Sequence, residues 1–549
     1  MRRGVVAGFT LLLTAVLPAC QEDGGGGGRT GTVAVADSLD PICADSTIHQ
    51  LCPVIPHEVV VQVPDGYTGF QPAVQAKFDM FSWQSFVALN WPANPDGTPL
   101  PTFDGNPTAP RVWETYLDAA EVYSSGGRTP CTVPPGGKFL GQMAKNGDVV
   151  DPDGDYDEAV GGPLADVNVN YVLYEKKINP DEAAYLRANR LNTVAGQMAA
   201  DSADTALVFT AGRNGGPVGS IEVKAAWRIL TSADADSATY YRRAGVVYVP
   251  ARNSATGKEM CLNVTVGLVG LHILHKTDQF RGDWIWTTFE HEGNAPLCTG
   301  SAAGAACGSE RPRWSLYNAA CTSCVPNDTL KLRPGDSTFL WNPTPPYAGL
   351  YAIQGKYGNQ ITRTQPLEGE TDTVNATWTA RVQNTVFKHY RLIGSQWMSG
   401  ELNPTPVPTL LRNTALESYL PTNSSCLGCH QYAATLPDSA LLDSVTKKPR
   451  TVFADFSFLL TMANRRTGEQ MLPPRVLRSV GPRPANQPFR HVTTEIFGNP
   501  GNRRPAAAPA AGGTAAPPAS PAAAAPPAAQ PAPPPAAPPA APPAKPRRR

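Results

Sequence analysis

Two cysteines and a histidine stand within the five residues Cys426-Leu427-Gly428-Cys429-His430, in a chain with eleven cysteines and eight histidines. Two thiols three positions apart on one helical turn can each form a thioether with a vinyl group of a haem. The adjacent imidazole can then bind the iron as its proximal ligand. The spacing therefore predicts one covalent haem c on Cys426, Cys429 and His430.

Two other interpretations of this motif are a redox-active disulfide pair and half of a zinc site. A thioredoxin-like C-x-x-C pair follows a strand of a βαβ unit. Here the preceding residues 413–420 have helical propensity, and a short loop of Pro, Thr, Asn and Ser separates them from the motif. This context favours haem attachment and predicts a helical haem c-binding segment over residues 401–497.

The pentapeptide resembles the haem-binding motif of the c-type cytochrome family, and residues from about 405 to 480 resemble that family loosely. The resemblance implies covalent haem c, His430 as proximal ligand and electron transfer. The stretches GLHILHKT and WIWTTFEHEGN are similar to those of large exported single-haem proteins with only a general cytochrome description. That similarity implies no particular activity.

A low-spin electron carrier needs a second axial iron ligand, usually Met or His. In simple cytochromes a methionine follows the motif by several tens of residues, often beside proline. Met471, in EQMLPPR, has this spacing. Met462 is the other methionine candidate, but it lies in an apolar run, where a methionine is more often a core residue.

Histidines of the region before the motif are the other candidates for the sixth ligand. On a strand, His272 and His275 face opposite ways and are not expected to form a two-histidine metal site. His291 would share its strand face with apolar residues that suit a porphyrin. For each of these histidines, the alternative is a hydrogen-bonded core residue that does not bind iron. Met471 and His291 rank level, and His272 comes next.

The N-terminus is typical of an export signal. Arg2 and Arg3 precede an apolar stretch over residues 4–19 that is too short to span a membrane. Residues 1–19 are therefore predicted to be a signal peptide. No later stretch is expected to cross a bilayer.

Residues 17–20, Leu-Pro-Ala-Cys, resemble a bacterial lipobox. The resemblance implies that Cys20 is the lipidated first residue of the mature protein. Because Gln21 follows it, the implied address is the outer membrane, facing the periplasm or the cell surface. Residues 20–45 then form a lipidated cysteine and a flexible tether.

The remaining cysteines predict disulfides. An even number in an exported protein indicates up to four bonds. The eight are Cys43, Cys52, Cys131, Cys261, Cys298, Cys307, Cys321 and Cys324. An alternative for the last four is a zinc site, which an oxidising compartment disfavours.

The stretch DPDGDYDEA, residues 151–159, is a candidate calcium loop. Its carboxylates are Asp151, Asp153, Asp155, Asp157 and Glu158. Calcium prefers many oxygen ligands, although the spacing differs from an EF-hand. The alternative is a surface turn rich in Asp and Gly.

The chain has 549 residues, and its 46 Lys plus Arg balance 46 Asp plus Glu, so no nucleic-acid partner is indicated. The predicted fold class is α+β, with a β-rich antiparallel core, sheet or sandwich, and helices near both ends. Residues 46–400 form the β-rich domain, 401–497 the haem segment and 498–549 a disordered Pro/Ala-rich tail. Expected helices lie at 78–91 and 178–189, and expected strands at 220–230, 244–250, 261–274, 283–291 and 384–394.

Two functional hypotheses follow. The first is a lipid-anchored electron-transfer protein with a redox partner protein and no catalytic residues. The second is a haem enzyme, similar to a peroxidase or oxygenase, with an open or weakly held sixth position and with His291 and Arg281 as distal groups. A third hypothesis, a structural or binding lipoprotein in which the haem only stabilises the fold, ranks below both.

Overall fold

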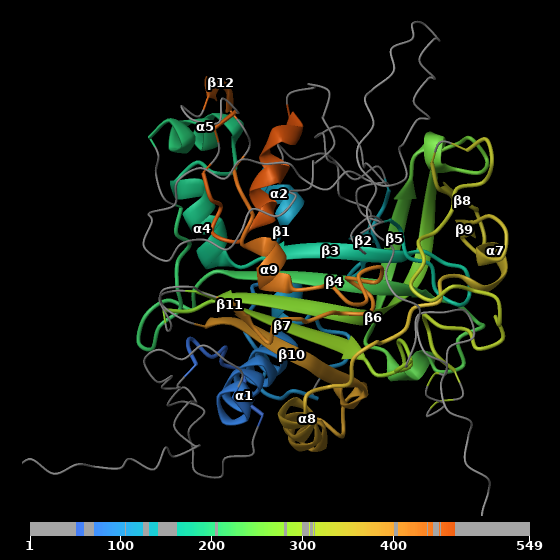
Figure 1. Ribbon diagram of the computed structural model, residues 1–549, viewed down its shortest axis with the longest axis horizontal. Coiled ribbons are helices and arrows are strands. Elements are labelled where there is room, and N and C mark those ends of the chain that lie inside the picture. The colour runs from blue at the N-terminus through green and yellow to red at the C-terminus, as the bar shows by residue number, and fades with distance from the viewer. Residues whose placement is uncertain are drawn as a thin grey trace, which may run out of the picture. The chain divides into compact units, whose positions relative to one another are not determined.

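A nine-stranded sheet forms the centre of the structure (Figure 1). The computed structural model describes residues 51–59, 71–104, 106–123, 131–140, 162–203, 207–278, 283–298, 307, 311, 313–336, 338–399, 405–435, 438–442, 449–450 and 452–466. The paired strands of the sheet are antiparallel, except for β2 and β5, which run parallel. The α+β class and the antiparallel core are therefore confirmed.

The strand order is β1-β3-β4-β6-β7-β10-β11, and β5 pairs with both β6 and β2. The strands are β1 Leu117–Asp118, β2 Lys138–Leu140, β3 Val172–Ile178, β4 Ile221–Leu230, β5 Arg242–Val249, β6 Met260–Lys276, β7 Trp284–His291, β10 Tyr390–Ser399 and β11 Thr405–Val407. Two separate pairs are β8 Leu340–Trp341 with β9 Ala348–Gly349, and β12 Asp438–Leu442 with β13 Pro449–Arg450.

The helices lie on both sides of the sheet (Figure 1). The α-helices are α1 Pro72–Leu89, α2 Ala119–Tyr123, α4 Pro180–Ala188, α5 Val194–Ala203, α7 Gln354–Tyr357, α8 Gly369–Arg381 and α9 Cys426–His430. The 3-10 helices are η1 Val112–Thr115, η3 Ser237–Thr239, η4 Ala251–Asn253, η5 Val386–His389 and η6 Phe458–Arg466. Among the described helices, none has the length and apolar character needed to span a membrane.

Each face of the sheet carries its own apolar core because side chains alternate along each strand. On one face, α1 and α8 cover β7 and β10, and Trp83 of α1 packs edge-on against Phe289 with ring centroids 4.8 Å apart. On the other face lie α2, α4, α9 and η6 (Figure 1). There Trp286 joins a cluster that includes Leu427 and Leu460. The motif segment thus packs directly on the central sheet.

The strands over 220–230, 244–250, 261–274 and 283–291 are confirmed as β4 to β7. The strand expected over 384–394 is shifted, because η5 occupies its first half and β10 runs on to Ser399. The pairing of Ser399 with Thr405 joins β10 to β11 across the expected boundary between residues 400 and 401. The described part of the motif segment therefore shares a sheet with the part before it.

The helix expected over 78–91 is confirmed as α1, and the one over 178–189 as α4. Asn179 caps α4 by accepting the Glu182 N–H at 3.1 Å, and Pro180 takes the first helical position. The helical propensity of 413–420 is misleading, because these residues form turns. Asn413 Oδ1 accepts the Ala415 N–H, and Glu417 Oε2 accepts the Asn413 N–H, so side chains replace helical backbone bonds.

The disulfide prediction is confirmed for the described cysteines. Bonds join Cys131 to Cys261, Cys298 to Cys307 and Cys321 to Cys324, and Cys52 is also disulfide-bonded. The last two bonds oppose zinc binding by those four cysteines, because disulfide sulfur is not a thiolate ligand.

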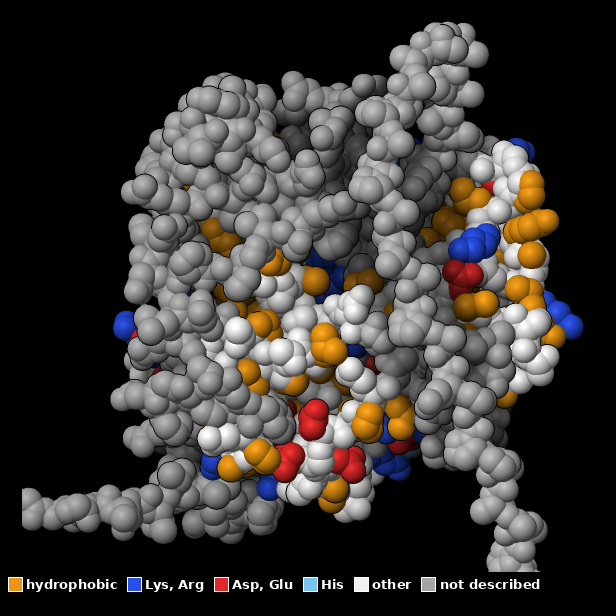
Figure 2. Space-filling model, viewed as in Figure 1, with side chains coloured by type: hydrophobic (Ala, Val, Ile, Leu, Met, Phe, Trp, Pro, Cys, Tyr) orange, Lys and Arg blue, Asp and Glu red, His pale blue; other side chains and the backbone are white. Residues whose placement is uncertain are grey.

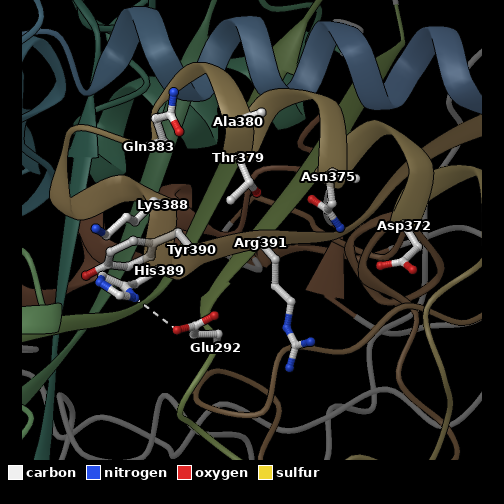
Figure 3. A pocket seen from close by; sticks show the side chains of 11 residues that line it. Glu292, Asp372, Asn375, Thr379, Ala380, Gln383, Lys388, His389, Tyr390 and Arg391 are labelled. Carbon is white, nitrogen blue, oxygen red and sulfur yellow. Dashed lines mark hydrogen bonds and ion pairs between the residues drawn. The ribbon is translucent and has the colours of Figure 1, made fainter.

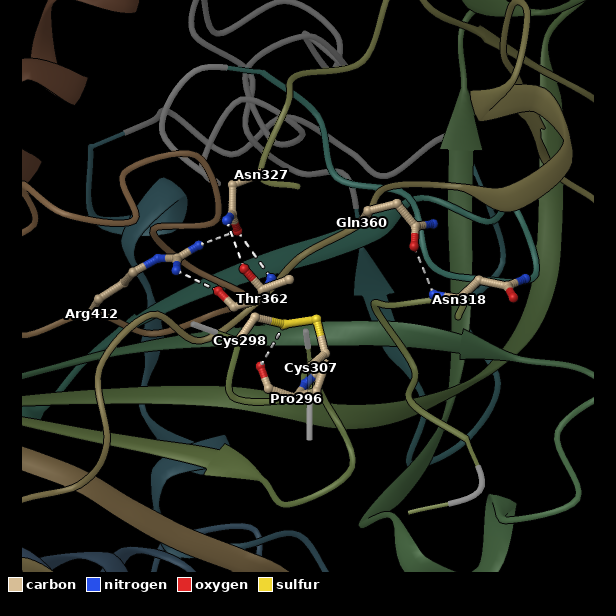
Figure 4. Close-up of a disulfide and its surroundings, with 8 residues drawn as sticks. All are labelled: Pro296, Cys298, Cys307, Asn318, Asn327, Gln360, Thr362 and Arg412. Atoms are coloured by element: carbon tan, nitrogen blue, oxygen red, sulfur yellow. Dashed lines mark hydrogen bonds between the residues drawn. A yellow bond between two sulfur atoms is a disulfide. The ribbon is translucent and has the colours of Figure 1, made fainter. Parts of the chain in front are cut away.

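One disulfide lies in the long loop region between β7 and α8. Residues close to it form hydrogen bonds between this region and the chain that leads into the Cys-x-x-Cys-His motif. Beside the Cys298–Cys307 bond, Arg412 donates to the Thr362 carbonyl at 2.7 Å and to Asn327 Oδ1 at 2.9 Å (Figure 4). Arg412 precedes the motif by fourteen residues. These bonds fix the chain that leads into α9.

Helix α8 begins with acidic residues, Glu370 and Asp372, at the positive end of its dipole. On the face shown in Figure 2, acidic side chains gather over this helix. The helix thus adds negative charge to the surface on the side of the sheet away from the motif.

Candidate functional site

The motif forms a short helix of its own, α9. Ser425 precedes it with extended backbone, and its hydroxyl accepts the Gly428 N–H at 3.2 Å. This cap satisfies one of the free amides at the helix start. A Cβ on Gly428 would lie 2.5 Å from the same hydroxyl oxygen, so any larger residue would displace the cap.

Gln396 of β10 fastens α9 to the sheet. Its Oε1 accepts the Leu427 N–H at 2.7 Å, and its Nε2 donates to Ser425 Oγ at 3.1 Å and to the Pro408 carbonyl at 2.6 Å. The side chain is fully buried. One amide therefore connects the sheet, the strand-end loop and the motif.

The imidazole of His430 has a defined orientation. Its Nδ1 lies 2.8 Å from the Phe456 carbonyl oxygen, which can only accept, so Nδ1 carries the hydrogen. Among the described residues no hydrogen bond reaches Nε2, whose lone pair is therefore available. Burial lowers the pKa of His430 to about 3, more than the bond to Phe456 raises it, so the ring is neutral at neutral pH.

The Phe456 carbonyl, which orients His430, belongs to a stretch of backbone with unusual dihedral angles. Asp455 and Phe456 have φ values of 47° and 69°, in the left-handed region that residues other than glycine rarely adopt. Asp455 is held by the Phe209 N–H at 2.8 Å and by Lys276 at 2.6 Å. The surrounding contacts thus maintain a strained turn that presents the Phe456 oxygen to the imidazole.

The two motif cysteines are free thiols, Cys426 buried and Cys429 exposed. Cys321 and Cys324 have the same C-x-x-C spacing but form a disulfide. Burial, and then the nearby Glu417, raise the pKa of both motif thiols. A disulfide-exchange pair requires a thiol of lowered pKa, so the electrostatics do not match that alternative.

The floor beneath α9 is built from rows of side chains that cross the sheet. The row under the motif crosses four strands and consists of Glu222, Leu274, Trp286 and Gln396. The next row on the same face consists of Lys224, His272 and Thr288. The Trp286 ring packs edge-on against His430 at 4.2 Å, and Phe458 of η6 does so at 4.9 Å. The imidazole is enclosed by aromatic rings on two sides.

His272 lies beside the motif. Its ring packs edge-on against the same Trp286 at 5.5 Å, so both imidazoles contact one indole. Its Nε2 bonds Glu417 Oε1 at 2.9 Å, and its buried Nδ1 has no partner among the described residues. Burial raises the pKa of Glu417, but His272, Lys224 and the Asn413 N–H together lower it by more, so the net shift is downwards. A carboxylate that orients an imidazole with one free nitrogen is a common support of metal-ligating histidines.

The structure does not bring His291 to the motif. His291 is two residues after Phe289 on β7, so both side chains point to the α1 side of the sheet. Trp286 points to the opposite side, towards α9. Both of its nitrogens are used, because Nδ1 accepts the Gly293 N–H at 3.1 Å and Nε2 donates to the Thr239 carbonyl at 3.2 Å.

His275 and Met462 take the places that the sequence predicted for them. His275 lies on the face opposite His272, where its ring contacts Phe81 at 5.4 Å. Met462 is buried in the cluster that contains Cys426 and Leu427. Neither is needed to explain the motif.

Several predicted positions lie outside the described residues. They are Cys20 with its signal and tether, Cys43, the candidate calcium loop at 151–159, Arg281, Met471 and the tail at 498–549. Within the described residues, no group of three or more His, Cys, Asp or Glu side chains could hold a metal ion.

A separate groove of about 590 Å³ lies between α8 and the start of β10 (Figure 3). Charged groups line it, including Glu292, Asp372, Lys388 and Arg391, and His389 bonds Glu292 at 2.9 Å. No residue of the motif lines this groove.

Four contributors to the site were not identified from the sequence: Gln396, Phe456, Trp286 and Glu417. For Trp286 a signal existed, since strand parity places it opposite His291. For the others no local signal exists, because each acts through a partner at least 26 residues away.

No protein family model, curated protein or solved structure matches the chain. The functional argument therefore depends on the site itself.

Proposed function

We propose that the chain is an extracytoplasmic c-type cytochrome that carries one covalent haem on Cys426, Cys429 and His430 and transfers electrons. The observation that carries this proposal is the orientation of His430. Its Nδ1 donates to the Phe456 carbonyl at 2.8 Å, while its Nε2 has no partner in the described part of the chain. Two free thiols stand on the same five-residue helix.

The donor set fits haem c. Cys426 and Cys429 would hold the group covalently, and His430 would bind its iron through Nε2; when bound, haem supplies one-electron chemistry. The Phe456 carbonyl fixes the tautomer of His430 and makes its free nitrogen more basic. Trp286 and Phe458 limit the access of water to the ring, which favours a stable ligand.

Of the three sixth-ligand candidates, we favour His272. It is on the motif side of the sheet, contacts the same indole as His430 and has a buried nitrogen without a partner among the described residues. Glu417 would hold its other nitrogen. His291 has no free nitrogen, and Met471 is outside the described residues.

The test is the visible spectrum of the reduced full-length protein, produced in cells that mature cytochromes c, with and without carbon monoxide. We expect covalently held haem and sharp α and β bands that carbon monoxide does not change. The matched control is Cys426→Ser with Cys429→Ser, which should carry no covalent haem. Wild-type protein without covalent haem would refute the proposal.

A second candidate function is a haem enzyme with an open sixth position. The observation that favours it is the His272–Glu417 pair beside the motif, since an imidazole backed by a carboxylate is also suited to act as a general base. Broad bands that shift with carbon monoxide would favour this candidate, and peroxide turnover would then be measured.

The proposed location is the outer membrane, with a lipid anchor on Cys20 and a redox partner protein in the periplasm or at the surface. The disulfides of the described residues support an oxidising compartment. Cys20→Ala should release the protein from the membrane fraction, and mass spectrometry of the mature N-terminus should detect the lipid only in the wild type.

A further inference from the structure

Two glutamates are buried together on the motif side of the sheet. Glu182, on the first turn of α4, is fully buried, and Glu222 of β4 is 7% exposed. Asn179 brings them together, because its Oδ1 accepts both the Glu182 N–H at 3.1 Å and the Ile221 N–H at 3.0 Å. The two carboxyl groups are close enough for Glu222 to raise the pKa of Glu182.

Most oxygens of this pair lack a hydrogen-bond donor. Neither oxygen of Glu182, nor Oε1 of Glu222, has a hydrogen-bond partner among the described residues. Two ionised carboxylates buried close together without donors would repel each other and lose their hydration, so a proton on one of them is favoured. Burial, then the neighbouring carboxyl, raise the pKa of Glu182 well above its usual value, and burial raises that of Glu222 to about 7. The pair therefore holds at least one proton at neutral pH and is close to taking up another.

The charged and titratable neighbours come from every element around the pair. Asp455 raises the pKa of both glutamates, and Lys176 of β3 lowers that of Glu222. Lys276 of β6 is paired with Asp455 at 2.6 Å and offsets part of its charge. The buried Tyr123 hydroxyl of α2 also faces the pair, and it has no hydrogen-bond partner among the described residues.

Three consecutive residues connect this cluster to the motif. Asp455 raises the pKa of both glutamates, the Phe456 carbonyl accepts from His430 Nδ1 at 2.8 Å, and Ser457 lowers the pKa of Glu222. Glu222 also stands in the same row across the sheet as Trp286, which contacts His430 at 4.2 Å. The pair and the proposed iron ligand thus share one strained turn and one row of the sheet.

We propose that Glu182 and Glu222 form a proton-exchange site, which takes up one proton from water when the haem accepts one electron from an external one-electron donor, and releases it on oxidation. The inference rests on the proposed function. Its physical reason is that an added electron makes the iron centre more negative, and a more negative neighbour favours the protonated carboxyl. Charge then balances, because one electron and one proton enter together.

The experiment measures the haem midpoint potential of the full-length protein from about pH 5 to about pH 9. In the wild type the potential should fall with pH over a window near neutrality, with a slope up to about 59 mV per pH unit, the value for one proton per electron. Glu182→Gln and Glu222→Gln should each flatten this slope. The matched control is Glu370→Gln on α8, which removes a carboxylate on the opposite side of the sheet and should keep the slope.

A second measurement needs no substitution. The infrared difference spectrum between oxidised and reduced wild-type protein should contain a protonated-carboxyl band that appears on reduction. Covalent haem whose potential does not change with pH, or a slope that both glutamine variants retain, would overturn the inference and leave the proposed cytochrome standing. A wild type without covalent haem would overturn both.

Discussion

The connection between the sheet and the motif leads to a quantitative prediction for Gln396→Leu. Leucine has nearly the same volume but can make none of the three bonds from Gln396 to Leu427, Ser425 and Pro408. A buried hydrogen bond contributes about 1 kcal/mol, and a buried group left without a partner costs about 1–3 kcal/mol. The Leu427 N–H would become such a group, whereas Ser425 keeps its bond with Gly428.

Added burial of the leucine side chain offsets part of this loss, so the free energy of unfolding should fall by about 3 kcal/mol. Urea titration followed by tryptophan fluorescence measures this change as a lower midpoint. The matched control is Gln383→Leu, the same replacement at an exposed position in the groove beside α8, which should change stability by under about 0.5 kcal/mol.

A functional readout accompanies the stability measurement. If Gln396 holds α9 in place, the variant should also carry less covalent haem per chain than the control. A change in unfolding free energy within about 0.5 kcal/mol of the wild type would refute the view that Gln396 anchors the motif.

Three further predictions concern ligation, acid stability and the disulfides. His272→Ala should make the reduced haem bind carbon monoxide, while His291→Ala should leave the spectrum unchanged; the reverse result would contradict the proposed ligand. His275 has its pKa lowered by burial to about 4, so the fold loses stability as pH falls from about 6.5 towards 4, by about 3 kcal/mol in total. His275→Gln should remove that loss in urea titrations at the two pH values, and an equal loss in both proteins would contradict it. Replacing Cys131 and Cys261 by alanine opens a loop of 130 residues and should lower the free energy of unfolding by up to about 5 kcal/mol. If reduction of the wild type left its free energy of unfolding unchanged, this prediction would be wrong.

The sequence by itself determined the features that depend on near neighbours in the chain. The C-x-x-C-H spacing, the cap of Asn179 on α4 and the alternation along β4 are local patterns, and the structure has α4 and β4 where those patterns predict them. Strand parity also placed His272 and His275 on opposite faces, because the side-chain period of a strand is two.

Tertiary structure decided which of those faces meets the motif. The order β4-β6-β7-β10 puts Trp286 and His272 under α9, and turns His291 towards α1. The alternation of side chains along each strand did not show which face of the sheet meets the motif, because pairing between distant strands depends on the packing of the whole sheet.

Tertiary structure also overrode local propensity next to the motif. Residues 413–420 favour a helix, yet Glu417 extends to His272 and to the Asn413 N–H, and turns result. Likewise, the carbonyl that orients His430 belongs to a turn 26 residues further along the chain. Such contacts are energetically favourable only in the folded molecule, where burial makes an unpartnered polar group costly.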